Sequence, residues 1–172
     1  LGMGESYALA HSMFASKKID NDAYIENEDL TELIIPEGVT HIGERAFSKC
    51  KNLKKLVLPE SLEYLGPSAF SGCENLEEIV LPKNIKKLHY RTFADCKRLK
   101  KIVIPEGIQE LDWAVFSGCE NLEEVVLPES TVKIGNQLFL NCKKLKSVVL
   151  PTNLKSLPDE CFKGCNHLDI IL

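Results

Sequence analysis

Apolar side chains return along the chain with a period of 23 residues. The repeat units open at successive leucines, which are Leu30, Leu53, Leu76, Leu99, Leu122, Leu145 and Leu168. The stretches 53–75 and 76–98 are the clearest pair of copies, and one follows the other without a gap. Such a fixed period predicts a solenoid, because one short unit cannot bury its apolar side alone and must stack on its neighbours.

Each unit begins with the pattern of a short strand. Counted from the opening leucine, positions 4 and 6 are Leu, Ile or Val in every complete unit, and position 7 is always proline. This alternation predicts a strand with one buried face, and proline ends it because proline has no N–H to donate. Apolar residues at positions 10 and 13 predict an extended second limb. In unit 5, Thr131 stands at position 10 and Val132 follows one place late, so we expect a local distortion there.

The rest of each unit carries a phenylalanine and a cysteine. Phenylalanine occupies position 18 and cysteine position 21 in six consecutive units. Positions 17, 18 and 21 and the next leucine are spaced like one face of a short helix. The predicted fold class is therefore an α/β repeat solenoid, a right-handed leucine-rich-repeat superhelix with one short parallel strand and one short helical turn per unit.

The period also divides the chain. Residues 30–167 form six units, and 168–172 begin another. Ile19, Ala23 and Tyr24 match the later units, so 19–29 is expected to be a degenerate partial repeat. Residues 1–18 have helix-forming content and are expected to be a cap or a linker. Because a solenoid needs caps at its ends, we expect the sequence to be an excised part of a longer protein.

The full pattern resembles the BspA-like leucine-rich repeat family. Its motif reads L-x-x-[IVL]-x-[IL]-P-x-x-[VIL]-x-x-[IL]-G-x-x-A-F-x-G-C, and it covers 30–172 strongly. The family's glycine at position 14 is present in three units, whereas His89, Asp112 and Pro158 replace it in the other three. The resemblance implies a cell-surface or secreted protein with an adhesin-like role, whose ligand is an extracellular-matrix or host surface protein.

Seven cysteines allow two interpretations. Neighbouring units approach within disulfide distance, so pairs such as Cys73 with Cys96 are one possibility. The interpretation we favour is a ladder of small buried thiols beside the phenylalanines, because every cysteine lies at a core position of the repeat. Only Cys161 and Cys165 have a spacing close to that of zinc ligands, and no second pair joins them, so no metal site is predicted.

The outward positions of the strands predict a binding surface. Position 5 is an unbroken apolar row from Ile34 to Val149, continued by Leu172, and positions 2 and 3 carry blocks of one charge that alternate from unit to unit. A continuous apolar strip on an exposed, concave sheet is a candidate surface for protein binding or self-association. The residues predicted to bind are Val57, Val80, Val103 and Val126, flanked by Lys54, Glu78, Lys101 and Glu124. The alternative for the charges is a self-neutralising ladder that only stabilises the stack.

A second candidate surface lies on the flank of the solenoid. Tyr90 and Trp113 share position 15 in consecutive units, and Tyr64 and His89 stand close by at positions 12 and 14. Tyrosine and tryptophan are favoured anchors at binding sites, although scattered surface aromatics are also ordinary.

Composition and motifs exclude several classes of function. A net charge of −4 with interspersed signs gives no reason to expect a nucleic-acid partner. No apolar run approaches the roughly 20 residues that span a bilayer, and residues 1–15 lack the pattern of a signal peptide. The sequence has no G-x-S-x-G, H-E-x-x-H or glycine-rich nucleotide motif, so neither an enzyme nor a cofactor is expected. The predicted function is a non-catalytic protein-binding module, and the alternative is a structural or self-associating spacer.

Overall fold

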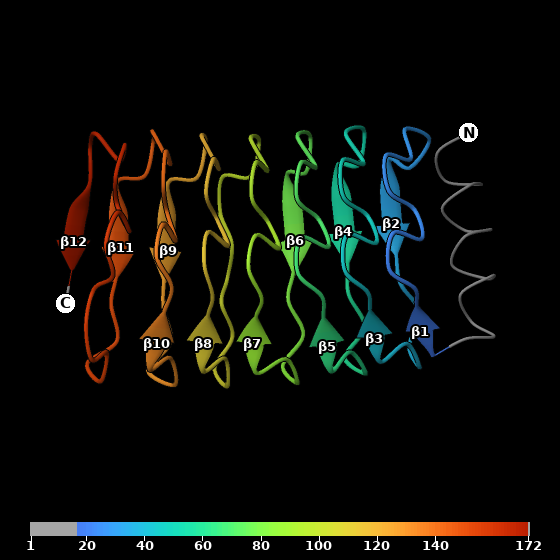
Figure 1. The fold of residues 1–172 in the computed structure, drawn as a ribbon, viewed down its shortest axis with the longest axis horizontal. Coiled ribbons are helices and arrows are strands. Elements are labelled where there is room, and N and C mark those ends of the chain that lie inside the picture. Colours follow the sequence, from blue (N-terminus) through green and yellow to red (C-terminus); the bar gives the residue numbers. More distant parts are fainter. Residues whose placement is uncertain (1–16, 172) are drawn as a thin grey trace.

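The repeat units stack side by side along the long axis of the molecule. In this computed structural model, residues 17–171 are described. Successive turns follow one another from the N-terminal to the C-terminal end, and each contributes strands that run in the same direction as those of its neighbours (Figure 1). The fold is a solenoid of parallel strands like that of leucine-rich repeats, as the period predicted.

The first row of strands lies where the alternating pattern predicted strands. It consists of β2 (Glu32–Ile34), β4 (Lys55–Val57), β6 (Glu78–Val80), β9 (Glu124–Val126), β11 (Ser147–Val149) and β12 (Asp169–Ile171). The row divides into two three-stranded parallel sheets, β2-β4-β6 and β9-β11-β12. Between them, residues 101–103 of unit 4 join β9 only through an isolated bridge from Lys101 to Glu124.

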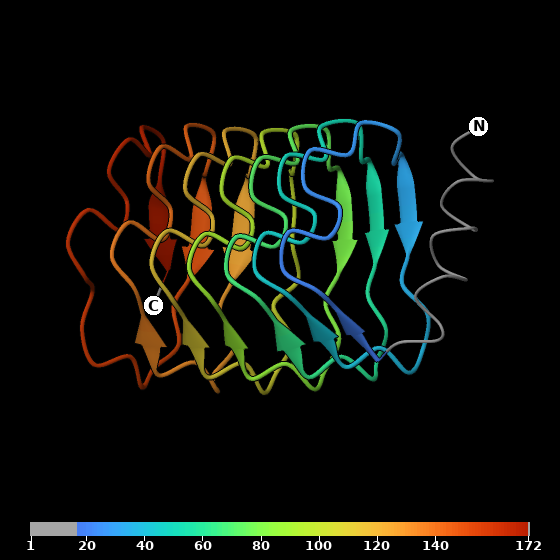
Figure 2. The same cartoon turned by 45° about the vertical axis from the view of Figure 1, so that its right-hand side comes forward.

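A second row of shorter strands lies along another edge of the solenoid (Figure 2). It consists of β1 (Lys18–Ile19), β3 (His41–Ile42), β5 (Tyr64–Leu65), β7 (Lys87–Leu88), β8 (Glu110–Leu111) and β10 (Lys133–Ile134). These strands form the parallel sheets β1-β3-β5 and β7-β8-β10. The extended limb predicted at positions 10–13 is therefore partly a second sheet.

The predicted helical turn is wrong. Within residues 17–171 the return limb contains no helix and is instead a run of tight turns. Its residues at positions 16 and 20 have positive φ, for example 54° at Arg45 and 58° at Lys49. Positive φ at every fourth residue is incompatible with a right-handed helix. The side-chain spacing of the two structures is similar, which is why the pattern suggested a helix.

Hydrogen bonds between units explain this backbone. The N–H groups of Arg45, Phe47 and Lys49 donate to the carbonyls of Pro67, Ala69 and Ser71 in the next unit, at 3.0, 2.9 and 2.7 Å. The amides between them close turns within the unit, as from Ala46 to the carbonyl of Gly43. Alternate N–H groups thus point along the solenoid axis, and the same three bonds recur at every unit interface in the described part of the chain.

The core is a ladder of identical side chains. Phe47, Phe70, Phe93, Phe116 and Phe139 are fully buried, and neighbouring rings stack at centroid distances of 5.3–6.1 Å with interplanar angles of 2–9°. Tyr24 of the partial repeat stacks on Phe47 at 5.3 Å. The leucines at position 1 and the aliphatic residues at position 4 pack beside this stack. Most of the burial is therefore shared between neighbouring units.

Two local expectations need correction. Thr131 is fully buried and keeps the core position, because its hydroxyl donates to the carbonyl of Ile108 at 2.9 Å, so Val132 is exposed and the expected distortion does not occur. The last unit is one residue shorter than the period, since Val149 is in register with Ile171. Leu172, which the period places in the apolar row, and residues 1–16 of the expected cap or linker at 1–18 lie outside the described residues.

The direction in which a glycine substitution changes the free energy of unfolding distinguishes left-handed turns from a helix. Lys49 is exposed and has φ of +58°, and glycine already occupies its position at Gly72, Gly118 and Gly164. We expect Lys49→Gly to raise the free energy of unfolding by about 0.5–1 kcal/mol, because a side chain in the left-handed region costs about 1–2 kcal/mol. In a helix the same change would lower it by about 1 kcal/mol. Urea unfolding followed by circular dichroism measures the difference.

The matched control is Lys51→Gly, two residues further along. Lys51 is also exposed but does not have positive φ, so this variant should be less stable than the parent protein. A loss of stability in Lys49→Gly equal to that in Lys51→Gly would contradict the left-handed turn.

Candidate protein-binding surfaces

The strand face is formed by the outward side chains of β2, β4, β6, β9 and β11 and of residues 101–103. Along it, the position-5 residues from Ile34 to Val149, here called the valine row, point away from the core. Val80, Val103 and Val126 are 61%, 70% and 59% exposed, whereas Val57 is half-buried. The row continues across the interruption of the sheet, and Val103, at the interruption, is its most exposed described member.

The charges beside the valine row are only partly paired. Lys54, Glu78, Lys101 and Glu124 are exposed, and none of them forms an ion pair with a described residue. On this face Lys55 contacts Glu32 at 3.9 Å, and Arg98 contacts Glu77 at 3.7 Å. The predicted self-neutralising ladder is realised more fully at position 22, where Glu28–Lys51, Glu74–Lys97 and Glu120–Lys143 pair at 2.9, 4.0 and 3.8 Å. Four charged groups therefore remain available beside the apolar row.

The predicted flank residues lie together in one cluster, the aromatic flank, defined as Tyr64, His89, Tyr90 and Trp113. The rings of Tyr64 and His89 have centroids 5.0 Å apart, and those of Tyr90 and Trp113 are 6.4 Å apart. Burial, with a smaller contribution from Lys87, lowers the pKa of His89, so its imidazole is neutral at pH 7.

Sequence reasoning missed the residues that hold the aromatic flank in place. Glu44 accepts a hydrogen bond from the Tyr90 hydroxyl at 3.2 Å, and Gln137 accepts one from the Trp113 indole nitrogen at 3.2 Å. The Arg91 guanidinium lies 5.8 Å from the Trp113 ring centroid. The period could have indicated these residues. Glu44 shares position 15 with Tyr90 and Trp113, and Gln137 and Arg91 share position 16.

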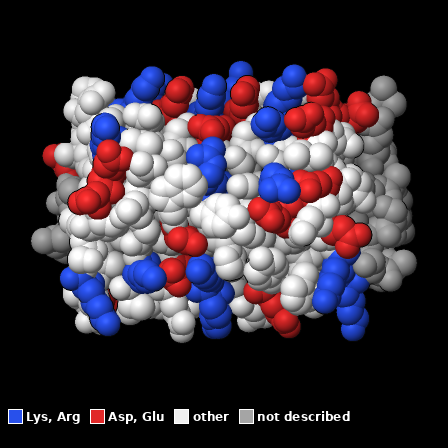
Figure 3. All heavy atoms as spheres, in the orientation of Figure 1, with Lys and Arg blue, Asp and Glu red and all other residues white. Residues whose placement is uncertain are grey.

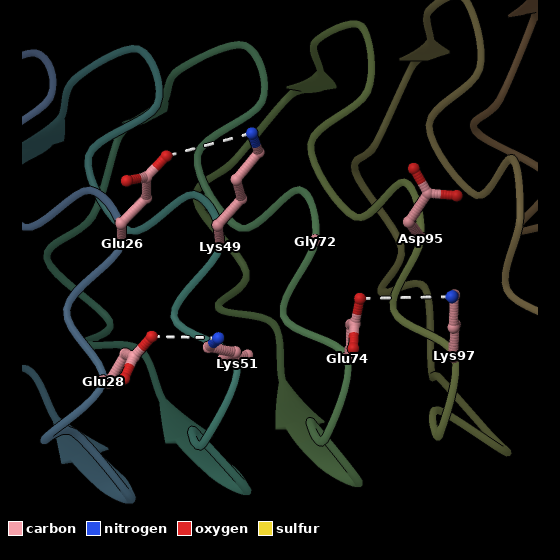
Figure 4. A pocket seen from close by; sticks show the side chains of 8 residues that line it. All are labelled: Glu26, Glu28, Lys49, Lys51, Gly72, Glu74, Asp95 and Lys97. Carbon is pink, nitrogen blue, oxygen red and sulfur yellow. Dashed lines mark ion pairs between the residues drawn. The ribbon is translucent and has the colours of Figure 1, made fainter.

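A charged hollow of 560 Å³ lies on the return limb (Figure 4). It opens where Gly72 carries no side chain between Lys49 and Asp95, as Figure 4 shows. Its lining side chains pair across the units, with Glu26–Lys49 at 3.9 Å and Glu28–Lys51 at 2.9 Å. Since its charges are exposed and largely compensate one another, the hollow offers little affinity for an ion of either sign.

The space-filling view agrees with this balance of charge. Lysines and arginines alternate with acidic residues over the visible face, and uncharged surface lies between them (Figure 3). Such a surface does not attract a polyanion over its whole area.

Comparison with known proteins identifies the repeat. The sequence profile of the BspA type Leucine rich repeat region matches six copies, over residues 17–145 and 87–172. The chain belongs to the BspA-type leucine-rich repeat family. None of the curated proteins compared with it matches.

Solved structures of bacterial leucine-rich repeat proteins share the fold. A leucine-rich repeat protein of T. pallidum is 34% identical, with a TM-score of 0.79, over 91% of this chain and 70% of its own length. A leucine-rich repeat protein from Bacteroides ovatus is 28% identical, with a TM-score of 0.59, over 90% of this chain and 57% of its own length. This BspA-type chain thus spans only part of both structures, and repeat proteins of this family are generally non-catalytic.

The described part of this BspA-type chain contains no group of three or more His, Cys, Asp or Glu side chains arranged to hold a metal ion. Over the same residues, no helix is long and apolar enough to cross a membrane.

The cysteines of this BspA-type repeat are buried thiols, as we favoured. All seven are free, and only Cys165 is more than slightly exposed. Each Sγ at position 21 donates to the backbone of the preceding unit, for example from Cys119 to the carbonyl of Phe93 at 3.2 Å. Burial raises the pKa of Cys50 to about 11 and that of Cys119 to about 12. These thiols are therefore protonated and poor nucleophiles at neutral pH.

Thiol labelling of the native protein checks this ladder. We expect iodoacetamide to label Cys165 first, because it is half-buried, and to label the other six only after unfolding. Since burial raises the pKa of Cys165 to about 11, its labelling rate should rise about tenfold per pH unit from pH 7 to 9. Mass spectrometry of digested samples locates the label, and a guanidinium-unfolded sample is the control. Native labelling of Cys119 as fast as that of Cys165 would contradict the buried ladder.

Proposed function

We propose that this chain is a non-catalytic protein-binding module, which binds its partner through the strand face as part of a cell-surface or secreted adhesin-like protein. The observation that carries the proposal is the valine row, an apolar strip over six units that is exposed at Ile34, Val80, Val103 and Val126 and half-buried at Val57 and Val149. The surface location and the class of partner, an extracellular-matrix or host surface protein, rest on the family resemblance.

Physical arguments favour the strand face over a purely structural role. The stack does not need valine at position 5, because the side chains there face solvent and threonine has a comparable strand propensity. Val80, Val103 and Val126 expose apolar surface to water in three consecutive units, and a partner that covered this surface would gain the free energy of burying it. Lys54, Glu78, Lys101 and Glu124 lie beside the row and have no ion-pair partner among the described residues, so they are available to fix the orientation of a partner.

A second candidate is a spacer that associates with itself. The observation in its favour lies at unit 6, where a 360 Å³ hollow is lined by Leu150, Leu154 and Leu157, and Leu157 is 49% exposed. A second copy seated there would cover this apolar hollow.

Surface plasmon resonance against a panel of extracellular-matrix and host surface proteins tests the main proposal. We expect a partner that binds the parent chain and loses at least about thirtyfold in affinity to the double variant Val80→Glu, Val103→Glu, because two carboxylates would then face its apolar contact. The control is Val132→Glu, which changes a valine that is 45% exposed but lies outside the row. Equal loss in the control, or unchanged binding by the double variant, would count against the strand face.

Light scattering over a range of concentrations tests the second candidate. Self-association through unit 6 predicts a molar mass that rises with concentration, and Leu157→Lys should abolish the rise by placing a charge in the apolar hollow. The strand-face double variant should associate like the parent chain. A constant monomer mass at all concentrations would remove this candidate.

A further inference from the structure

The units of the solenoid are joined along three lines, which are the two rows of strands and the return limb. The return limb is hydrogen-bonded from unit to unit between the partial repeat and unit 6. Each strand row, by contrast, is interrupted once. The first row is open between units 3 and 4, and the second row between units 2 and 3 (Figure 1). Both interruptions therefore border unit 3.

The first row lacks its backbone bonds at one interface. At position 2, the N–H of each unit donates to the carbonyl at the same position of the preceding unit, as from Glu77 to Lys54 at 2.9 Å. The bond from Glu123 to Lys100 has the same length. The N–H of Lys100 itself has no hydrogen-bond partner among residues 17–171. Units 3 and 4 are thus not bonded to each other along the strand face.

The second row lacks the equivalent bonds one interface earlier. At position 11, the N–H of Glu63 donates to the carbonyl of Thr40 at 2.9 Å, and that of Gln109 to the carbonyl of Lys86 at 2.8 Å. The N–H groups of Lys86 and His89 have no partner in the described part of the chain. The glycines at the position of His89 all donate to the preceding unit, at 2.8 Å.

The two interruptions divide the strands into two bodies. The strand β6 of unit 3 pairs with β4 of unit 2, whereas β7 of the same unit pairs with β8 of unit 4. The division therefore passes through unit 3 along residues 81–86, which join β6 to β7. We call the two interruptions and residues 81–86 the seam. Of the three lines that join the units, only the return limb is hydrogen-bonded across it.

The packing is also loosest at the seam. The ring centroids of Phe70 and Phe93 are 5.9 Å apart and those of Phe93 and Phe116 6.1 Å apart, whereas the other neighbouring rings of the core stack lie 5.3–5.8 Å apart. Ile79 and Ile102, at position 4 on the two sides of the first interruption, are 8% and 4% exposed. Their counterparts in units 1, 2, 5 and 6 are 0–1% exposed.

The side chain of His89 accounts for the gap in the second row. A Cβ on Gly66 would lie 2.7 Å from the backbone of unit 1, so units bonded at position 14 leave little room for a side chain. The ring of His89 instead lies against that of Tyr64 in unit 2, with centroids 5.0 Å apart. Asp112 shows that a side chain here does not open every interface, because its N–H still donates to Leu88 at 2.9 Å.

We propose that unit 3 is a hinge, about which the parts of the solenoid on either side of the seam turn relative to each other. The return limb is the pivot, because its bonds to the neighbouring units continue through unit 3. Bending about it breaks no backbone bond of the strand rows, since these rows carry none across the seam. The few residues at 81–86 absorb the change in backbone angles, as connecting segments do in hinged proteins.

The hinge has a consequence for the strand face. Val80 and Val103 stand on opposite sides of the first interruption and are among the most exposed members of the valine row. Bending changes their separation, and so the curvature that the face presents to a partner. This consequence rests on the proposed function, whereas the hinge itself does not.

Residual dipolar couplings of the backbone amides test the hinge without any partner. They average over motions up to milliseconds, which is the range of hinge bending. We expect the couplings of residues 17–75 and of residues 104–171 each to fit the structure, but with alignment tensors that differ in magnitude or orientation by more than the experimental error. A single tensor that fits both sets would overturn the hinge, whatever the outcome of the binding experiments on the strand face.

Amide hydrogen exchange tests the open interfaces one by one. The amides of Lys86 and Lys100 should exchange about a hundredfold faster or more than those of Gln109 and Glu123, which occupy the same positions in bonded units. Equal protection within each pair would mean that the strand rows are closed in solution, which would also overturn the hinge.

The variant His89→Gly should stiffen the seam, because it restores the glycine found at position 14 of units 1, 2 and 5. We expect exchange at Lys86 to slow by about tenfold or more and the two alignment tensors to converge. The matched control is Asp112→Gly, which makes the same change in a unit that is already bonded and should alter neither readout. Circular dichroism checks that both variants fold. Unchanged exchange at Lys86 in folded His89→Gly would contradict the role given to His89.

Discussion

The structure depends on the hydrogen bonds that join the return limbs of neighbouring units. Three N–H groups of each unit point along the axis and donate to the next unit, and this ladder is unbroken from Asp22 to Asn141. It fixes the separation and the register of the units at once. The phenylalanines can stack at nearly constant distance only because the backbone beneath them repeats in this way.

The two strand rows are less regular than the return limb. The first row is interrupted at residues 101–103, and the second between β5 and β7. The second interruption falls where His89 replaces glycine. A Cβ on Gly66 would lie 2.7 Å from the backbone of the preceding unit, and one on Gly135 2.4 Å, so a side chain at this position pushes neighbouring units apart. The N–H of Asp112, which also replaces this glycine, still donates to the carbonyl of Leu88 at 2.9 Å, so a side chain at this position does not break the ladder in every unit.

The sequence predicted what the period determines. The solenoid, the strand at positions 3–5, the buried phenylalanines and thiols and the neighbourhood of Tyr90 and Trp113 all follow from residues 23 apart lying side by side. It did not predict the conformation of the return limb, because a short helix and a run of left-handed turns place positions 17, 18 and 21 on the same side. Only the backbone hydrogen bonds to the next unit distinguish the helix from the turns, and these bonds do not alter the spacing of the side chains. The distortion expected at Thr131 was wrong for a related reason, since its hydroxyl donates a hydrogen bond to the carbonyl of Ile108 in the neighbouring unit.

The same division between fixed and free positions bears on function. Positions 4, 6, 18 and 21 are held by packing and the ladder, so they cannot vary without cost to the stack and carry no information about a partner. Position 5 is free to vary, yet it stays aliphatic in every complete unit. Positions 12 and 15 also lie outside the core and vary from unit to unit, with His41 and Glu44 in unit 1 and Glu110 and Trp113 in unit 4. A uniform apolar row suits the proposed partner that runs along many units, and it requires no residue on which the stack depends.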